Sequence, residues 1–174
     1  MMENNPKYIK AARKIFQNYS RMKMEIMQLD NSISYMQKNI EANVDSDIHS
    51  ASVSHGSGGA IGSFSNCSTD KIPQIVENVD KIRRQYESNI CNLIGRKNFL
   101  ESVVKSIDIF VSSLEWTDKT LITRHYMEEK KKSYDEISAE TYNTAESLRK
   151  RERKILNSYI KTAHIDIMLI SQML

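Results

Sequence analysis

The sequence predicts an all-α protein in which a long, coiled-coil-like two-helix hairpin is followed by a C-terminal helix-turn-helix domain. Three observations support this prediction: two long stripes of apolar residues spaced three and four apart, a glycine-rich interruption between them, and two short capped helices near the C-terminus. The 174 residues include only five Gly and two Pro, so the chain has few sites for tight turns. That length suits one or two small domains.

Residues 6–43 carry the first apolar stripe and predict one long N-terminal helix. Asn5 can cap this helix, and Pro6 suits its first turn. A helix with so narrow an apolar face is unstable alone and needs a partner helix. The stripe consists of Tyr8, Ala12, Ile15, Tyr19, Met22, Ile26, Leu29, Ile33, Met36 and Ile40.

Residues 44–71 interrupt the pattern, and we expect a flexible Ser/Gly-rich linker there. Residues 52–63 hold four of the five glycines, and such a composition is typical of a flexible connector. His49, His55 and Cys67 also fall in this segment, but their irregular spacing does not fit a structural zinc site. We therefore predict no metal and no cofactor.

Residues 72–114 carry the second apolar stripe and predict a second long helix. A stutter at Tyr86–Ile90 would locally unwind a coiled coil, and Gly95 could mark a bend. The first helix could pair with this one as an antiparallel hairpin, or a second copy of the chain could do so, and the sequence leaves both arrangements open. The stripe consists of Ile75, Val79, Ile82, Tyr86, Ile90, Leu93, Leu100, Val104, Ile107, Val111 and Leu114.

Residues 115–164 predict a helix-turn-helix domain. Ser133 and Glu136 have the spacing of a capping box, and Thr144 is a good N-cap for the helix that follows. Thr117 can cap an earlier helix, with Trp116 at the hydrophobic-staple position and therefore in the core. The expected core consists of Trp116, Leu121, Ile122, Tyr126, Ile137, Leu148, Ile155 and Leu156.

The last of these helices is strongly basic, although the whole chain has a net charge of only +3. Residues 145–161 hold six Lys or Arg against two Glu. Arg149, Lys150, Arg153 and Lys154 fall on the side opposite the apolar residues. A basic face is often no more than a solvated surface, but together with two short helices and a tight turn it favours insertion of this helix into a DNA groove.

Residues 114–159 resemble the C-terminal DNA-binding region of sigma-70-type factors. The matching residues are Leu114, Tyr126, Ser133, Glu136, Ile137, Ser138, Thr144, Ser147, Leu148, Arg149, Lys150 and Leu156. The layout of the whole chain is similar to phage or prophage late-gene transcription regulators of the RinA/ArpU type. This resemblance implies an activator of phage late genes that binds double-stranded DNA, and it leaves open whether the protein also contacts RNA polymerase.

The resemblance also implies which residues face DNA. They are Thr144, Ala145, Glu146, Arg149, Lys150, Arg153 and Lys154. The chain departs from the family at the turn, where Thr141 replaces Leu, Tyr142 replaces Gly and Asn143 replaces an apolar residue. Because Asn tolerates a left-handed backbone, we expect the turn to be displaced by one residue, which leaves the register of the recognition helix open.

Two other functions fit parts of the sequence. A coiled-coil structural or interaction protein would explain both long stripes, but not the capped turn and the basic helix together. A minimal alternative sigma factor fits less well, because residues 6–43 form an apolar stripe instead of a promoter-melting domain. We predict no enzyme and no catalytic residue, since His125 and His164 have no nucleophile or carboxylate at a recognisable spacing.

Compartment and assembly can be inferred from the remaining features. Cys67 and Cys91 are isolated, which suggests a reducing compartment. We find neither a signal sequence nor an apolar run of membrane-spanning length, so we expect a cytoplasmic, DNA-associated protein of a bacterial host. Residues 165–174 predict an apolar helical tail that packs on the long helices or on a partner subunit of a homo-oligomer.

Overall fold

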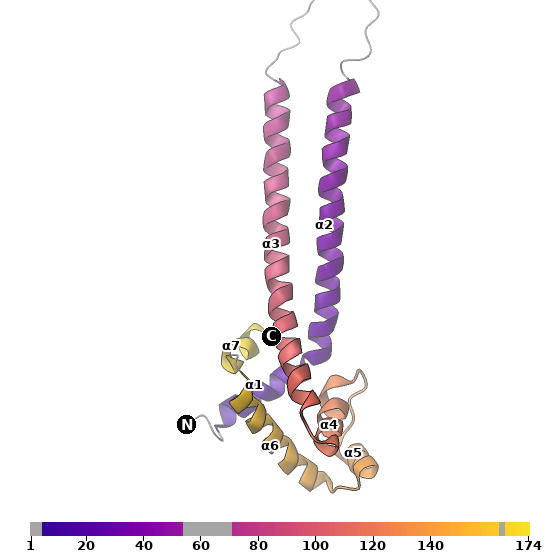
Figure 1. Ribbon diagram of the computed structural model, residues 1–174, viewed down its shortest axis with the longest axis vertical. Helices are drawn as coiled ribbons and strands as arrows, with labels where there is room; N and C mark the ends of the chain where they lie inside the picture. Colours follow the sequence, from indigo (N-terminus) through magenta and orange to yellow (C-terminus); the bar gives the residue numbers. More distant parts are fainter. Residues whose placement is uncertain (1–4, 54–70, 164–165) are drawn as a thin grey trace, which may run out of the picture. The chain divides into compact units, whose positions relative to one another are not determined.

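The computed structural model describes residues 5–53, 71–163 and 166–174. In these residues the protein is all-helical and has no strand (Figure 1), as the sequence predicts. The elements are α1 (Pro6–Gln17), α2 (Tyr19–Val53), α3 (Lys71–Ser112), α4 (Trp116–Ile122), the π-helical turn η1 (Thr123–Met127), α5 (Tyr134–Thr141), α6 (Ala145–Thr162) and α7 (Ile167–Met173). None of the described helices combines the length and apolar character needed to span a membrane.

The chain forms two compact units. Unit 1 consists of Met1–Ile26 together with Asn98–Leu174, and unit 2 consists of Met27–Lys97. The two ends of the sequence therefore belong to the same unit, and the middle of the sequence forms the other. Each unit has its own buried apolar residues.

The N-terminal stripe is divided between two helices instead of forming the single helix expected over residues 6–43. Asn18 interrupts it with φ −91° and ψ 2°, and its side-chain Nδ2 donates to the Lys14 carbonyl over 2.8 Å. An Asn side chain that bonds to the backbone competes with helix propagation, so α1 ends here. The start of α1 is as predicted, because the Asn5 side chain accepts from the Lys7 N–H at 3.0 Å and Pro6 occupies the first turn.

The core of unit 1 is an aromatic cluster to which several helices contribute. The Phe16 ring of α1 lies 4.9 Å from the Tyr159 ring of α6, centroid to centroid, and 6.4 Å from the Phe110 ring of α3. Tyr126 of η1 approaches the same Phe16 ring at 6.1 Å. Edge-to-face contacts of this kind add to the burial of apolar area. The first half of the N-terminal stripe is thus packed inside unit 1.

Unit 2 contains the remainder of α2 and the first part of α3, which lie side by side (Figure 1). Ile33 of α2 and Ile90 of α3 are buried, and Lys97 Nζ lies 2.6 Å from Asp30 Oδ1. Other apolar side chains stay exposed, including Tyr35 and Ile82. A two-helix contact therefore buries only part of the two stripes.

The expected linker begins later than predicted. Helix α2 continues to Val53, so residues 44–53 are helical, because the first glycine of the chain stands at position 56 and no proline intervenes. Residues 54–70, with His55 and Cys67, lie outside the described residues, as does the side chain of His49. Helix α3 continues through Gly95 without interruption.

Helix α4 starts two residues earlier than the staple prediction, with Thr117 as the N-cap, requires. Glu115 occupies the N-cap without a side-chain hydrogen bond, and Trp116 is the first helical residue. A staple residue must precede the N-cap, so Trp116 cannot play this role, and its side chain is 69% exposed. The prediction that Trp116 lies in the core is wrong. The other expected core residues are buried: Leu121, Ile122, Tyr126, Ile137, Leu148, Ile155 and Leu156.

The C-terminal tail forms α7, which packs on α1. Asp166 caps it by accepting from the N–H groups of Met168 and Leu169, and Ile167 and Ile170 are buried. Lys14 of α1 donates to the Ser171 carbonyl over 2.7 Å. Helix α7 does not continue α6, because Ala163 has an extended backbone with ψ 114°.

Candidate nucleic-acid interface

Helix α5 begins with the capping box that the sequence predicts. The Ser133 hydroxyl accepts from the Glu136 N–H at 3.3 Å, and the Glu136 carboxylate accepts from the Ser133 N–H at 2.7 Å. These bonds from the Ser133 backbone and hydroxyl, with nearby lysines, lower the pKa of Glu136. The start of α5 is therefore set by residues adjacent in sequence.

The turn between α5 and α6 is formed by Tyr142, which adopts a left-handed conformation with φ 55° and ψ 27°. The prediction that Asn143 would take this conformation is wrong. Asn143 instead donates through Nδ2 to the Thr141 carbonyl at 2.8 Å and accepts at its own carbonyl from Ser138 Oγ at 2.5 Å. These two bonds hold the residue after the turn, while the Tyr142 side chain is 98% exposed.

Helix α6 has one buried and one exposed face. Thr144 caps it, as predicted, by accepting from the Ser147 N–H at 3.2 Å. Its buried residues are Leu148, Glu152, Ile155, Leu156 and Tyr159. The structure places most of the predicted DNA-facing residues together on the exposed face: Glu146, Arg149, Lys150, Arg153 and Lys154. Thr144 is also exposed, and Ala145 is half-buried.

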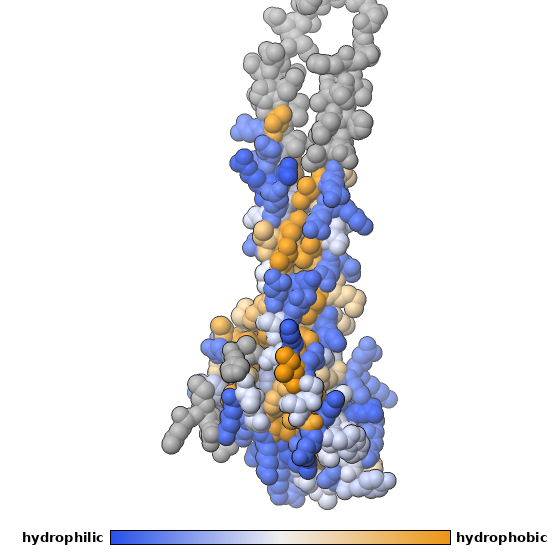
Figure 2. Space-filling view, in the orientation of Figure 1, coloured by the Kyte–Doolittle hydropathy of each residue, from blue (hydrophilic) through white to orange (hydrophobic). Residues whose placement is uncertain are grey.

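The exposed residues of α6 differ in their contacts. Lys150 Nζ lies 2.7 Å from Glu146 Oε1, but both side chains are about three-quarters exposed, so water weakens this pair. The Arg149 guanidinium lies 5.4 Å from the centroid of the Tyr134 ring on α5. Figure 2 shows hydrophilic residues dominating the surface over α6 in this view.

Glu152 is a residue of this helix whose role the sequence did not predict. It is only 2% exposed, although it stands in an otherwise basic segment. Arg13 of α1 donates to its two oxygens at 3.0 and 3.2 Å, and the Tyr134 hydroxyl donates at 2.9 Å. The Tyr126 hydroxyl donates to it as well. The available signal was its spacing, since Glu152 stands four residues after Leu148 on the apolar face.

The ionisation of this cluster follows from its hydrogen bonds. Burial raises the pKa of Glu152, but the bonds from Arg13, Tyr126 and Tyr134 outweigh burial and lower it below the ordinary value. Burial and the neighbouring carboxylate raise the pKa of Tyr134 to about 12. At neutral pH the carboxylate is therefore charged and the phenols are donors. The cluster joins α1, η1, α5 and α6.

Helix α6 is also tied to α4. Arg151 Nε lies 2.6 Å from Asp118 Oδ1, and both side chains are partly buried. Glu152 and Arg151 thus bond α6 to its neighbours on two sides. The exposed cations Arg149, Lys150, Arg153 and Lys154 are left on its solvent-facing side. The arrangement presents a cationic face on a helix that is bonded to α1 and α4.

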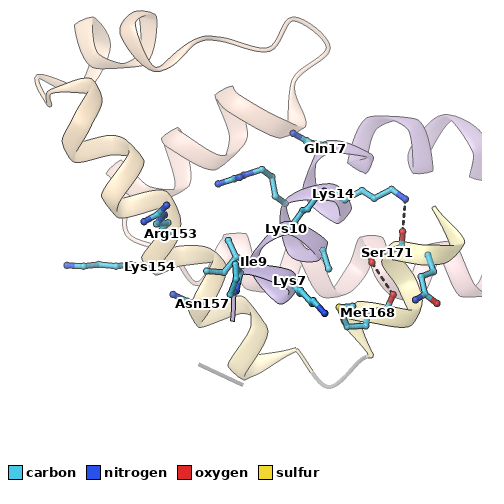
Figure 3. A pocket seen from close by; sticks show the side chains of 14 residues that line it. Lys7, Ile9, Lys10, Lys14, Gln17, Arg153, Lys154, Asn157, Met168 and Ser171 are labelled. Carbon is cyan, nitrogen blue, oxygen red and sulfur yellow. Dashed lines mark hydrogen bonds between the residues drawn. The ribbon is translucent and has the colours of Figure 1, made fainter. Parts of the chain in front are cut away.

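A cleft of about 1210 Å³ lies beside this face, between α1, α6 and α7 (Figure 3). The cations that line it come from two helices: Lys7, Lys10, Arg13 and Lys14 of α1, and Arg153 and Lys154 of α6. The described lining residues include no carboxylate. Arg13 is held by Glu152, and Lys14 by the Ser171 carbonyl.

The chain matches no protein-family model, and no curated protein or solved structure is significantly similar to it.

Proposed function

We propose that this protein is a sequence-specific DNA-binding transcription regulator in which α5, the Tyr142 turn and α6 form a helix-turn-helix. The observation that carries the proposal is the one-sided charge of α6. Its exposed face holds Arg149, Lys150, Arg153 and Lys154, while its other face is anchored through Glu152. Two short capped helices with a tight turn are the geometry that places a recognition helix in the major groove.

The N-terminal half of α6 supplies the base contacts in this proposal. Residues near the start of a recognition helix reach base edges, which assigns this role to Ala145, Glu146, Arg149 and Lys150. Arg and Lys suit the guanine acceptors, and Glu suits the cytosine amino group. The exposed pair between Glu146 and Lys150 costs little to separate, so it leaves both side chains available.

The remaining residues would set position and affinity. Thr144 at the helix start, with Arg153 and Lys154 further along, would contact phosphates. Because Arg149 rests over the Tyr134 ring, α5 would hold this side chain in place until it meets a base.

The biological role follows from the resemblance to phage and prophage late-gene regulators. We propose an activator that acts on DNA in a bacterial cytoplasm and contacts RNA polymerase, with α2 and α3 as a hairpin that also serves self-association. The quoted sigma-70-like residues between Leu114 and Tyr159 support this proposal.

A selection from random double-stranded DNA by the full-length protein tests the function. We expect one motif to be enriched, and we expect Arg149→Ala with Lys150→Ala to remove the enrichment. Lys38→Ala with Lys81→Ala is the matched control, because it removes two exposed lysines of unit 2 and leaves α6 intact. Absence of binding by the folded protein, at low and moderate salt, would contradict the proposal.

The second candidate is a coiled-coil interaction protein without DNA binding. Unit 2 favours it, because Met27, Tyr35 and Ile82 are each at least half exposed along the two long helices. Apolar side chains left uncovered in this way mark a protein-protein contact. A chain that self-associates or binds another helix, but enriches no DNA, would establish this alternative.

A further inference from the structure

The cations of the cleft are not explained by the stability of α1. Lys7 and Lys10 lie in the first turns of α1, which contain no acidic residue. Positive charge near a helix N-terminus opposes the helix dipole and is unfavourable. The two side chains are exposed and make no contact with a described carboxylate. Their accumulation therefore calls for a partner outside the chain.

The position of α1 brings these lysines to the same cleft as Arg153 and Lys154 on the exposed face of α6. Arg13 and Glu152 bring the two helices together, and Glu152 directly precedes Arg153 and Lys154. Lys7, Lys10 and Lys14 are spaced three and four apart, so they share one side of α1. Figure 3 shows Lys7 and Lys10 on α1 and Arg153 and Lys154 on α6 around the same cleft, with the Lys154 side chain extending away from α1.

We infer that Lys7 and Lys10 of α1, with Arg153 and Lys154 of α6, bind the phosphate backbone of the duplex beside the bases that α6 reads. This inference rests on the proposed DNA binding and adds a second helix to the interface. The partner is identified by its charge: cations from two helices, around a cleft lined by no described carboxylate, fit a polymer that presents several phosphates to one surface. Phosphate contacts position a protein without reading sequence.

The test compares full-length Lys7→Ala with Lys10→Ala against the control Lys38→Ala with Lys81→Ala. Both double variants lose two exposed lysines, so net charge changes equally. At 0.15 M salt we expect the α1 variant to lose roughly five-fold in affinity per lysine, equally for selected and unrelated duplexes. The slope of log K against log salt should fall by about 0.9 for each phosphate contact removed.

Duplex length provides a second measurement. Removing base pairs from the side that faces α1 should weaken binding by the wild-type protein and leave the α1 variant unaffected. The opposite flank, shortened equally, should affect both proteins alike.

The outcomes separate this inference from the proposed function. If the wild-type protein enriches a motif but the α1 variant behaves as the control does, α1 makes no contact with DNA and the inference is overturned. If the wild-type protein binds no duplex, the proposed function fails and the inference fails with it. Thermal unfolding of each variant checks that the fold is retained.

Discussion

Glu152 illustrates how one buried side chain can hold together the helices that carry a candidate interface. It lies on the buried face of α6, and it is bonded to Arg13, Tyr126 and Tyr134. A buried carboxylate is costly unless such partners satisfy it, and removal of one member of a buried pair leaves the other unpaired. The position of the exposed cations therefore depends on a residue that solvent barely reaches.

Replacement of Glu152 by Gln should destabilise the protein by about 2 kcal/mol, less than for a fully buried pair because Arg13 remains partly exposed. Since the native pKa of Glu152 is lowered, its contribution is complete above the ordinary pKa of Glu and is lost as the pH falls through the native value. Urea unfolding at neutral and acid pH measures this, and wild-type stability should fall more than that of the variant. Glu146→Gln, at an exposed site, is the control, and equal curves for Glu152→Gln and wild type would refute the role.

The left-handed backbone of Tyr142 is energetically unfavourable, and its exposed side chain makes no buried contact that would offset this. A left-handed conformation costs a residue with a Cβ about 1 kcal/mol, and glycine avoids that cost. Because the Tyr142 side chain is exposed, Tyr142→Gly should stabilise the protein by up to about 1 kcal/mol, reduced by the entropy glycine loses on folding. Thermal unfolding checks it, with Tyr142→Val expected to destabilise; the reverse order would mean that the ring makes contacts of its own.

At the scale of elements, local hydrogen bonds were predictable and long-range packing was not. The caps at Asn5, Ser133 and Thr144 depend on residues two or three positions away, so a segment of four or five residues is enough to predict each of them. The division of the N-terminal stripe at Asn18 was not predicted, because the spacing of apolar residues indicates a buried face but does not indicate which helices will pack against it. The part of the stripe on α1 packs with α6 and α7, and the later part on α2 lies beside α3.

The candidate interface followed the same rule. The exposed face of α6 could be predicted from its charge spacing, whereas the contribution of α1 could not, because Arg13 and Glu152 are 139 residues apart. The exposure of Trp116 was missed for a smaller reason: the helix starts two residues earlier than predicted, and a staple depends on the exact start.

Helix α7 contributes to the stability of unit 1 through its apolar face. Ile170 is buried against its surroundings, so Ile170→Ala should cost about 2–4 kcal/mol. Its neighbour Leu169 is 53% exposed, and Leu169→Ala should cost less than about 1 kcal/mol. Denaturant midpoints of the two variants measure the difference. Similar midpoints would show that α7 is not packed on α1 in solution.

At the scale of the whole molecule, we expect unit 1 to fold without unit 2. Unit 1 contains both chain ends, and Lys97 and Asp30 approach each other near its boundaries. Residues 27–97 could therefore be replaced by a short Gly/Ser linker, and we expect the shortened protein to fold and to select the same DNA motif. Circular dichroism and DNA selection measure this, and a change of motif would assign sequence reading to unit 2.

A fragment of residues 115–164 provides the contrasting control. It keeps α4, α5 and α6 but lacks Phe16, Phe110 and Arg13, which complete the aromatic core and the Glu152 cluster. Such a fragment leaves a buried carboxylate without its cation and should not fold. Cooperative unfolding of the fragment would contradict this expectation.

The distance in sequence between Arg13 and Glu152 also has a consequence during synthesis. Glu152 is added 139 residues after Arg13, which takes a ribosome roughly seven to thirty seconds, and throughout that time α1 lacks its partner helix. A nascent or prematurely terminated chain carries the lysines of α1 but no α6, so it has only part of the cationic surface. Under the proposed function, chains that stop early would therefore lack the recognition helix, and only completed chains would bind DNA with sequence preference.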